Sequence, residues 1–401
     1  MYNMTFPYIS QIKVHNCFAY KDFLIPSSEL IDFKHIVLTG KNGSGKTTIL
    51  NRIAFLLAQL QDGKTKEELI DSLKGTIEAN KNYPTRPVWE QQIRDAEDID
   101  LLHLGGTSSY LKEQTDGYIF SFFKARRKVD LTQVTTVTKE EEFLSNFKKQ
   151  DKAEEFTNQF KQYLVNKKVY EAFDYMNSKN ERIDQNKLFF DDLTETLKTI
   201  FNDEKLQLSF VQESFEFYIK FKDGRQVTFN QLSDGFSAFL SILMDLFMRT
   251  DLIRKAKGDY SLEPEGIVLI DEPETHFHLS MQYEILPLIN KLFPKIQLII
   301  ATHSPAIISS IKNAIVYDLT SKEEVSDWVL GSSYSELMIK HFGLDNEYSP
   351  VADKIIFEIN KAVKEKDVQK LKLIFVENEN YLTPSLRLEI ESQIIHINAS
   401  I

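Results

Sequence analysis

The sequence predicts an α/β protein with a mixed, mainly parallel β-sheet at its core. Three short apolar runs, at residues 36–38, 267–270 and 298–300, have the length and composition of strands that are buried on both faces. Glycine or polar residues follow each run closely, and after the first run apolar residues recur with helical spacing. Ligands of α/β sheets bind beyond the carboxyl ends of the strands, so we expect the functional residues just after these runs.

Composition limits the class of protein. A chain of 401 residues with 42% hydrophobic and 27% charged residues is typical of a globular protein with one large or two ordinary domains. Its single cysteine, Cys17, excludes a disulfide framework within the chain and fits a reducing compartment. The opening MYNMTFPYIS lacks the basic flank and apolar core of a signal peptide, and no run of about 18 apolar residues follows. We therefore expect a cytoplasmic protein with no membrane partner.

Charge gives a weaker indication about partners. The formal net charge of −11 argues against a general polyanion binder, because nucleic-acid affinity depends largely on Lys and Arg side chains that neutralise phosphates. The densest basic cluster is KARRK, residues 124–128. It fits a solvated strand end at least as well as a nucleic-acid contact, so nucleic acid stays possible but is not indicated.

The segment HIVLTGKNGSGKTTIL, residues 35–50, carries the strongest local signal. A β-branched apolar run leads through Gly-x4-Gly-Lys-Thr into a helical pattern, which is the context of a phosphate-binding P-loop. Glycines let successive backbone N–H groups turn toward the phosphates, and the helix directs its positive end at them. Lys46 is expected to reach the β- and γ-phosphates, and Thr47 to bind Mg²⁺. The expected nucleotide-binding residues are Gly40, Lys41, Asn42, Gly43, Ser44, Gly45, Lys46, Thr47 and Thr48.

Two carboxylates end the second apolar run, in GIVLIDEPETHFHLSMQ, residues 266–282. An acid at this position meets the Mg²⁺ of a nucleotide that a P-loop holds, so Asp271 is the expected metal ligand. Glu272 is the expected general base for the attacking water. Structural salt bridges also produce an Asp-Glu pair after a strand, but the P-loop elsewhere in the chain favours the catalytic interpretation.

A histidine ends the third apolar run, in KIQLIIATHSP, residues 295–305. His303 is placed to donate a hydrogen bond to the γ-phosphate or to the water, whereas a capped surface histidine is the alternative. Two further histidines, His276 and His278, lie two positions apart beside Glu274. No third or fourth ligand cluster accompanies them, so a structural zinc site is not expected.

These segments, taken together, resemble the ABC-type ATPases of the RecF, SMC and OLD group, within the AAA family ATPases. The resemblance covers about residues 5–60 and 205–320, and the start ISQIKVHNCFAYKDFLI is similar to the family's opening pair of strands. Four motifs carry it in the family's order, namely GKNGSGKTT, LSDG, IVLIDEPETHFH and ATHSP. The resemblance implies that ATP and Mg²⁺ are the cofactors.

The LSDG turn has its own implication. The resemblance implies that Ser233 and Gly235 contact the γ-phosphate of ATP bound to another subunit, so two chains sandwich two nucleotides in a homodimer or a higher oligomer. A turn that begins a helix offers a hydroxyl and backbone N–H groups to an anion, which agrees with this role.

The chain departs from the family at two places. Phe277 and Leu279 stand where Leu and Pro are usual, which leaves His276 and His278 without a catalytic role. No clear glutamine loop is present; the strand YIFSFFKARR is similar to the place where it belongs, and Gln133 is too weakly placed to be that residue.

The expected organisation follows from the distance between the motifs. Residues 1–138 form the first part of the ATPase domain, 139–204 a helical lid, 205–325 the second part, and 326–401 a helical C-terminal extension. The hairpin that precedes the LSDG turn has alternating aromatic residues, and these either pack within the domain or stack on bases. LKLIFVENENYL, residues 371–382, resembles the opening strand of a Toprim nuclease, but too little chain follows and a helix is expected. The apolar residues with helical spacing in the lid are Phe156, Phe160, Tyr163, Leu193, Leu197 and Ile200.

Similarity to the defence ATPases of Septu, PARIS and retron systems implies a function. We expect an ATP-driven switch that dimerises around ATP and controls a separate effector, a nuclease or a toxin, in anti-phage defence. The alternative is a RecF-like DNA repair ATPase that clamps DNA between its subunits.

Overall fold

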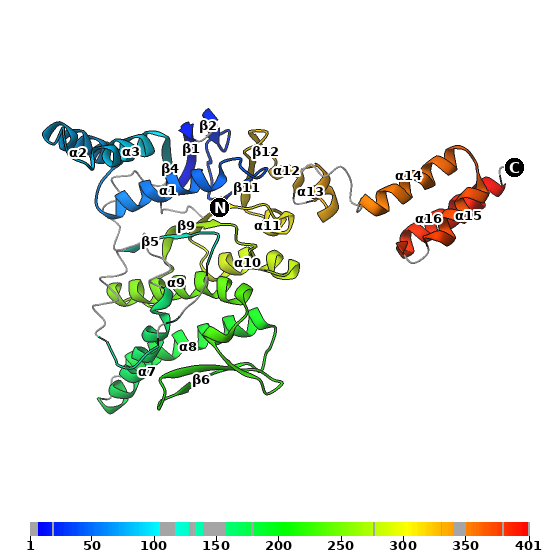
Figure 1. Ribbon diagram of the computed structural model, residues 1–401. Coiled ribbons are helices and arrows are strands. Elements are labelled where there is room, and N and C mark those ends of the chain that lie inside the picture. Colours follow the sequence, from blue (N-terminus) through cyan, green and yellow to red (C-terminus); the bar gives the residue numbers. More distant parts are fainter. Residues whose placement is uncertain are drawn as a thin grey trace. The chain divides into compact units, whose positions relative to one another are not determined.

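The computed structural model describes most of the chain. It covers residues 7–17, 20–104, 117–127, 131, 133–138, 157–177, 180–275, 277–329, 331–340, 350–378 and 381–399. The chain divides into two compact units, Met1–Ser332 and Ser333–Ile401, and each is described by itself below. Helices and strands alternate through the first unit (Figure 1), which confirms the predicted α/β class.

A six-stranded sheet forms the centre of the first unit, in the order β12-β11-β3-β10-β9-β5. Its inner strands are parallel and only β12 is antiparallel, so the sheet is mixed as expected. All three apolar runs that the sequence singled out are strands of this sheet, and they are buried along their length. The strands are β3 (His35–Thr39), β5 (Tyr118–Phe123), β9 (Glu265–Asp271), β10 (Ile296–Ala301), β11 (Ala314–Asp318) and β12 (Glu323–Glu324).

Helix α1 (Lys46–Gln61) follows the glycine loop and packs on the central sheet. Its apolar residues recur with helical spacing because only one stripe of the helix faces the core. A second, three-stranded sheet completes this core with β1 (Tyr8–Cys17) between β2 (Tyr20–Ile25) and β4 (Ile99–Leu104). β1 and β2 are antiparallel, which confirms the predicted opening pair of strands.

One buried amide joins the two sheets. The side chain of Gln297, on β10, accepts a hydrogen bond from the N–H of Ile9 at 2.8 Å and donates to its carbonyl at 2.8 Å. The same Nε2 donates to the carbonyl of Lys34 at 2.9 Å, just before β3. Gln297 is fully buried, so these bonds satisfy polar groups that would otherwise be costly inside the core.

A helical hairpin between α1 and β4 has no counterpart in the sequence-based prediction. It consists of α2 (Lys66–Ala79) and α3 (Arg86–Glu97), and a capping box formed by Thr65 and Glu68 begins it. Few residues of the hairpin are buried, which is why its apolar periodicity is weak in the sequence.

Two further helices lie in the predicted lid, α7 (Phe160–Met176) and α8 (Asn180–Phe201). Phe160, Tyr163, Leu193 and Leu197 are buried as the helical spacing predicts, whereas Phe156 and the first part of the lid lie outside the described residues. Helix α9 (Asp234–Lys257) runs beside α8, and almost its whole length from Gly235 onward is buried.

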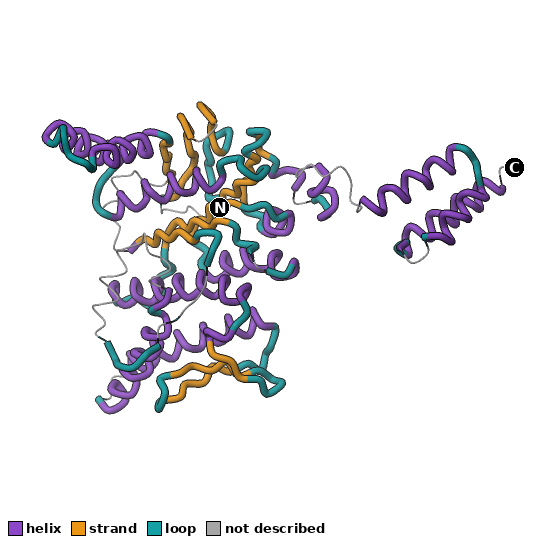
Figure 2. The backbone as a smooth tube through the Cα atoms, in the orientation of Figure 1, coloured by secondary structure: helices purple, strands orange, loops and turns teal. Residues whose placement is uncertain are grey.

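The hairpin before the signature turn is a separate sheet of β6 (Gln207–Val211), β7 (Glu216–Lys220) and β8 (Gln226–Thr228). Figure 2 shows its strands apart from the central strands, with α8 and α9 between the two sheets. Phe217 is 1% exposed and its ring lies near those of Phe190 and Phe210. This aromatic side chain therefore packs within the unit, as the first of the two interpretations predicts, and it is not available to stack on bases.

The remaining elements of the first unit are short apart from α10. They are the 3₁₀ turn Phe229–Gln231, α10 (Leu279–Leu292), α11 (Pro305–Ser310) and α12 (Ser326–Val329). Among the residues described in both units, no helix has the length and the apolar character that crossing a bilayer requires.

The second unit is helical in all its described parts. It contains α13 (Tyr334–Lys340), α14 (Pro350–Lys364), α15 (Val368–Glu377) and α16 (Pro384–Ala399). Leu371 and Ile374 lie on the buried face of α15, so the segment that resembled a Toprim strand is the expected helix.

Gly266 is required by a close approach of two strands. A Cβ atom at this position on β9 would lie 2.4 Å from the carbonyl oxygen of Ile119 on β5, and backbone cannot move aside easily. We expect Gly266→Ala to lower the free energy of unfolding by about 1–3 kcal/mol or more, as overpacking does. Gly75→Ala, where α2 leaves open space around the new methyl group, is the matched control and should stabilise by about 0.5–1 kcal/mol. Urea unfolding of both variants tests this, and equal effects would contradict it.

Candidate nucleotide-binding site

The glycine loop joins β3 to α1 in a conformation that its sequence requires. Gly40 has a φ of +132°, and a Cβ atom there would lie 2.8 Å from Oγ1 of Thr320 and 3.0 Å from Oδ1 of Asp318. Gly45 caps α1 with a φ of +83° and no side-chain hydrogen bond. The first N–H groups of α1 thus have no capping side chain, which suits an anion at the helix N-terminus.

Lys46 folds back over the loop that it follows. Its Nζ donates to the carbonyl of Gly40 at 2.9 Å, to the carbonyl of Lys41 at 3.2 Å and to Oγ of Ser44 at 3.3 Å. The residue is 6% exposed. Burial lowers the pKa of Lys46 to about 8, although the carboxylates of Glu272 and Asp271 act in the opposite direction. The protonated form of Lys46 is therefore partly disfavoured by burial, and a bound phosphate would stabilise it.

The expected metal ligands are in direct contact. Thr47 Oγ1 donates to the carboxylate of Asp271 at 3.0 Å and 3.2 Å, which joins the start of α1 to the end of β9. Burial raises the pKa of Asp271, and the hydrogen bond from Thr47 lowers it. A hydroxyl and a carboxylate are oxygen ligands of the kind that Mg²⁺ takes, with phosphates and water supplying the rest. These residues fit a nucleotide-bound Mg²⁺.

Glu272 has a strained backbone. Its φ is +46°, in the left-handed region that residues with a side chain rarely adopt. Its N–H donates to the carbonyl of Ala301 at 2.8 Å, which fixes it against the end of β10. Such strain concentrates at functional sites, and here it sets the direction of the expected general base.

His303 lies at the same edge of the sheet. Burial and the charge of Lys46 lower its pKa, while Glu272 raises it. The neutral imidazole can donate one hydrogen bond and accept another. The residue is half-buried and close enough to Lys46 and Glu272 for their charges to matter, so it is not a surface histidine apart from the site.

Glu274 is an acid that the sequence prediction did not place in the site. Its Oε1 accepts a hydrogen bond from the backbone N–H of His303 at 2.8 Å. Burial raises the pKa of Glu274, and the hydrogen bond from His303 lowers it. This carboxylate joins the loop after β9 to the loop after β10. In the sequence, the two histidines close to Glu274 suggested a possible metal site and not a contact with His303.

The signature turn begins α9. Ser233 is the N-cap residue of this 24-residue helix; it is exposed and makes no side-chain capping bond, while Gly235 is buried. The Ser233 hydroxyl is thus not used in capping its own helix. The assigned roles of Ser233, Gly235, Glu272 and His303 remain predictions.

The basic cluster KARRK is a solvated strand end only in part. Lys124 and Arg126 are exposed, as a solvated strand end predicts, but Arg127 is 6% exposed. Its guanidinium donates to the backbone carbonyls of Asp271 at 2.7 Å and Glu272 at 2.9 Å. The side chain is drawn inward because those carbonyls end the neighbouring strand β9. Lys128 lies outside the described residues.

The histidine pair is only partly described. His276 lies outside the described residues, and His278 is the exposed N-cap residue of α10. No group of three or more His, Cys, Asp or Glu side chains that could hold a metal occurs in the described part of the chain.

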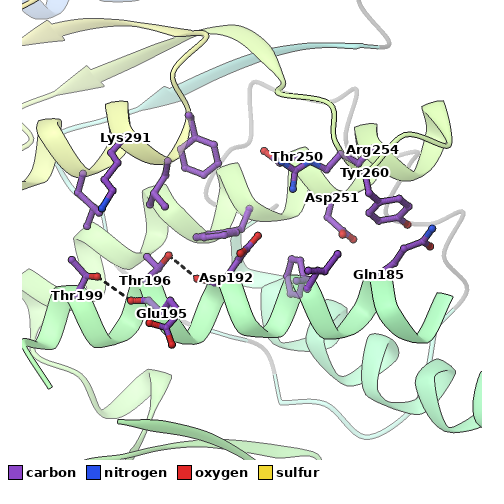
Figure 3. Close-up of a pocket in the computed structure, with 16 residues that line it drawn as sticks. Gln185, Asp192, Glu195, Thr196, Thr199, Thr250, Asp251, Arg254, Tyr260 and Lys291 are labelled. Atoms are coloured by element: carbon purple, nitrogen blue, oxygen red, sulfur yellow. Dashed lines mark hydrogen bonds between the residues drawn. The ribbon is translucent and has the colours of Figure 1, made fainter. Parts of the chain in front are cut away.

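A cavity away from the phosphate site lies between α8, α9 and α10. Its volume is about 460 Å³. Figure 3 shows Asp192, Arg254 and Lys291 at its walls. None of its lining residues belongs to the glycine loop, so the phosphate site is identified by its chemistry and not by the size of a cavity.

The fold and this arrangement of motifs resemble those of ABC-type ATPases. The family model described as AAA domain, putative AbiEii toxin, Type IV TA system matches residues 111–309. Septu protein PtuA of Bacillus thuringiensis is 26% identical over 366 residues, which cover 87% of this chain and 88% of that protein. Retron Ec83 probable ATPase of Escherichia coli is 34% identical over 110 residues, 25% of this chain and 20% of that protein.

A solved structure is also similar, at lower identity. The Smc head domain of Pyrococcus furiosus, bound to the C-terminal domain of ScpA, matches with a TM-score of 0.38 and 13% identity, over 80% of this chain and 95% of that chain. The sequence relatives confirm the expected resemblance to ABC-type ATPases and to Septu and retron proteins. The closer likeness to OLD and PARIS proteins stays a prediction.

The pKa of Lys46 predicts how ATP affinity depends on pH. Above pH 8 the free protein loses the Lys46 proton. The binding of ATP must then be accompanied by proton uptake at Lys46, which restores the cation. The terminal phosphate is already fully ionised there, because its second pKa is about 6. We expect the affinity to be constant from pH 7 to 8 and then to fall by up to about tenfold per pH unit.

Calorimetry in buffers of different ionisation enthalpy measures both the affinity and the proton uptake. Lys64→Ala removes an exposed lysine beyond α1 and is the control that should keep the wild-type profile. An affinity that is flat between pH 7 and 9.5 would contradict a depressed pKa at Lys46.

Proposed function

We propose that the chain binds Mg·ATP at the glycine loop and hydrolyses it. The observation that supports this most strongly is the contact between Thr47 Oγ1 and the Asp271 carboxylate, with Lys46 on the same loop. The hydroxyl and the lysine are neighbours in the sequence, whereas the carboxylate lies 224 residues beyond Thr47, and all three meet where strand ends and a helix N-terminus coincide. This is the set that a nucleoside triphosphate with its Mg²⁺ needs.

Hydrolysis uses groups that the fold has already placed. Mg²⁺, when bound, neutralises charge on the β- and γ-phosphates. Lys46 holds the γ-phosphate, and Glu272 accepts a proton from the attacking water as the water oxygen bonds to the γ-phosphorus. The bond between that phosphorus and the β,γ-bridging oxygen breaks, and ADP leaves with the electron pair. His303 donates a hydrogen bond to the γ-phosphate and so stabilises the charge that develops there.

ATP also holds two copies of the chain together. In this proposal the ligand of the Ser233 hydroxyl and of the N-terminus of α9 is the γ-phosphate that the partner copy's glycine loop holds. A two-fold arrangement then places two nucleotides between two subunits, and hydrolysis releases them. The exposure of Ser233 and the absence of a capping bond from its side chain support this role.

The output of the switch comes from a separate effector, a nuclease or a toxin, in anti-phage defence. The similarity to a Septu protein over 87% of this chain, and to a retron ATPase, supports this context.

A RecF-like DNA clamp has less support. It requires an accessible basic surface, yet Arg127 of the densest basic cluster is buried and its hydrogen bonds go to backbone carbonyls. Duplex DNA that neither binds the ATP-loaded protein nor stimulates hydrolysis would remove this alternative. Binding that weakens steeply with salt would restore it.

Two substitutions separate nucleotide binding from turnover. We expect Lys46→Ala to lose ATP binding, because the loop loses its cation for the phosphates. Glu272→Gln should bind ATP normally but hydrolyse it about 10²- to 10⁴-fold more slowly, because an amide cannot accept the proton. Glu213→Gln, an exposed acid in the turn before β7, is the control.

Phosphate release and binding of a fluorescent ATP analogue are measured on the same preparations. Turnover of Glu272→Gln at the wild-type rate would exclude this residue as the base. ATP binding by Lys46→Ala at wild-type affinity would place the phosphate site elsewhere.

A further inference from the structure

Arg127 lies in the loop that leaves the strand next to the catalytic one. Strands β5 and β9 are parallel neighbours, and Phe123 pairs with Ile270. A chain that continues beyond Phe123 therefore passes the end of β9, where Asp271 and Glu272 stand. This is also the place in the sheet where the expected glutamine loop has no clear counterpart.

The guanidinium of Arg127 holds the backbone of both acids. Nη1 donates to the carbonyl of Asp271 at 2.7 Å and to that of Lys124 at 2.7 Å, and Nη2 donates to the carbonyl of Glu272 at 2.9 Å. Charge-assisted hydrogen bonds of this length are about twice as strong as neutral ones. The planar fork of arginine reaches two successive carbonyls at once, which a lysine cannot do with the same geometry.

These bonds act on a strained residue. Glu272 adopts φ +46°, and its carbonyl also accepts from the N–H of Thr275 at 3.2 Å and from its hydroxyl at 3.0 Å. The carbonyls of Asp271 and Glu272 lie on the two sides of the Glu272 Cα atom, so holding both fixes the backbone from which the two carboxylates project. An error of about 1 Å in placing such a group costs about a hundredfold in rate.

We propose that Arg127 is a positioning residue that sets the direction of Glu272 and Asp271 by holding their backbone carbonyls. The inference rests on the proposed ATPase function. The hydrogen bonds of Arg127 go to backbone carbonyls, so it acts on turnover through the two acids.

Arg127→Gln and Arg127→Lys test this role, with Arg126→Ala as the matched control at an exposed neighbour. We expect Arg127→Gln to lower kcat about ten- to a hundredfold, as loss of a supporting hydrogen bond at a metal site does, with KM for ATP nearly unchanged. Arg127→Lys should keep an intermediate kcat, because it retains the charge and reaches one carbonyl. Arg126→Ala should match the wild type.

A second readout does not need turnover. Arg127 holds the carbonyl of Asp271, an expected Mg²⁺ ligand, so loss of that support in Arg127→Gln should raise the Mg²⁺ concentration that gives half-maximal thermal stabilisation by ATP. Arg126→Ala should leave this concentration unchanged.

Several outcomes would overturn the inference. They are a wild-type kcat in Arg127→Gln, a loss of kcat in Arg126→Ala of equal size, or a rise in KM that accounts for the whole effect. If Arg127→Gln does not fold, a wild-type kcat in Arg127→Lys would overturn it alone. A wild-type protein that binds ATP without hydrolysing it would instead contradict the proposed function, and the Mg²⁺ titration would then decide the inference.

Discussion

The parallel pairing of β3, β10 and β9 places every polar group of the site. These strands end at one edge, with Ile300 in register with both Val37 and Ile270. The strand ends therefore bring together residues that are far apart in the sequence. These are the glycine loop after β3, the acids after β9 and the histidine after β10. The hydrogen bond between Thr47 and Asp271 crosses the position of the strand between them, so the register must be correct for it to form.

Burial gives these groups their chemistry. Burial disfavours the charged forms of both Lys46 and Asp271. The attraction between the two opposite charges offsets this effect only in part. A nucleotide supplies the missing phosphate charge and its Mg²⁺ the missing cation, which makes binding favourable for both residues. Helix α9 also holds a buried charge. Its fully buried Asp245 accepts hydrogen bonds from Arg249 and from Ser121 of β5. The signature helix is thereby joined to β5, the strand whose following loop contains Arg127.

The sequence predicted those parts of the site that depend on short-range pattern. Strand, glycine loop and helix are adjacent in the chain, so Lys46 and Thr47 could be placed before the structure was known, and Asp271 followed from a buried strand with an acidic end. Arg127 could not be recognised, because its partners are backbone carbonyls that leave no trace in the residue letters. Glu274 was missed for a related reason: its partner is the N–H of His303, a contact that only the sheet register creates.

The proposed dimer requires that ATP join two copies of the chain through the Ser233 turn. Light scattering with and without Mg·ATP measures this as the solution mass of Glu272→Gln and of the double variant that also carries Ser233→Arg. We expect ATP to double the mass of Glu272→Gln and to leave the mass of the double variant unchanged. A Glu272→Gln protein that binds ATP without any change in mass would show that ATP does not join two copies.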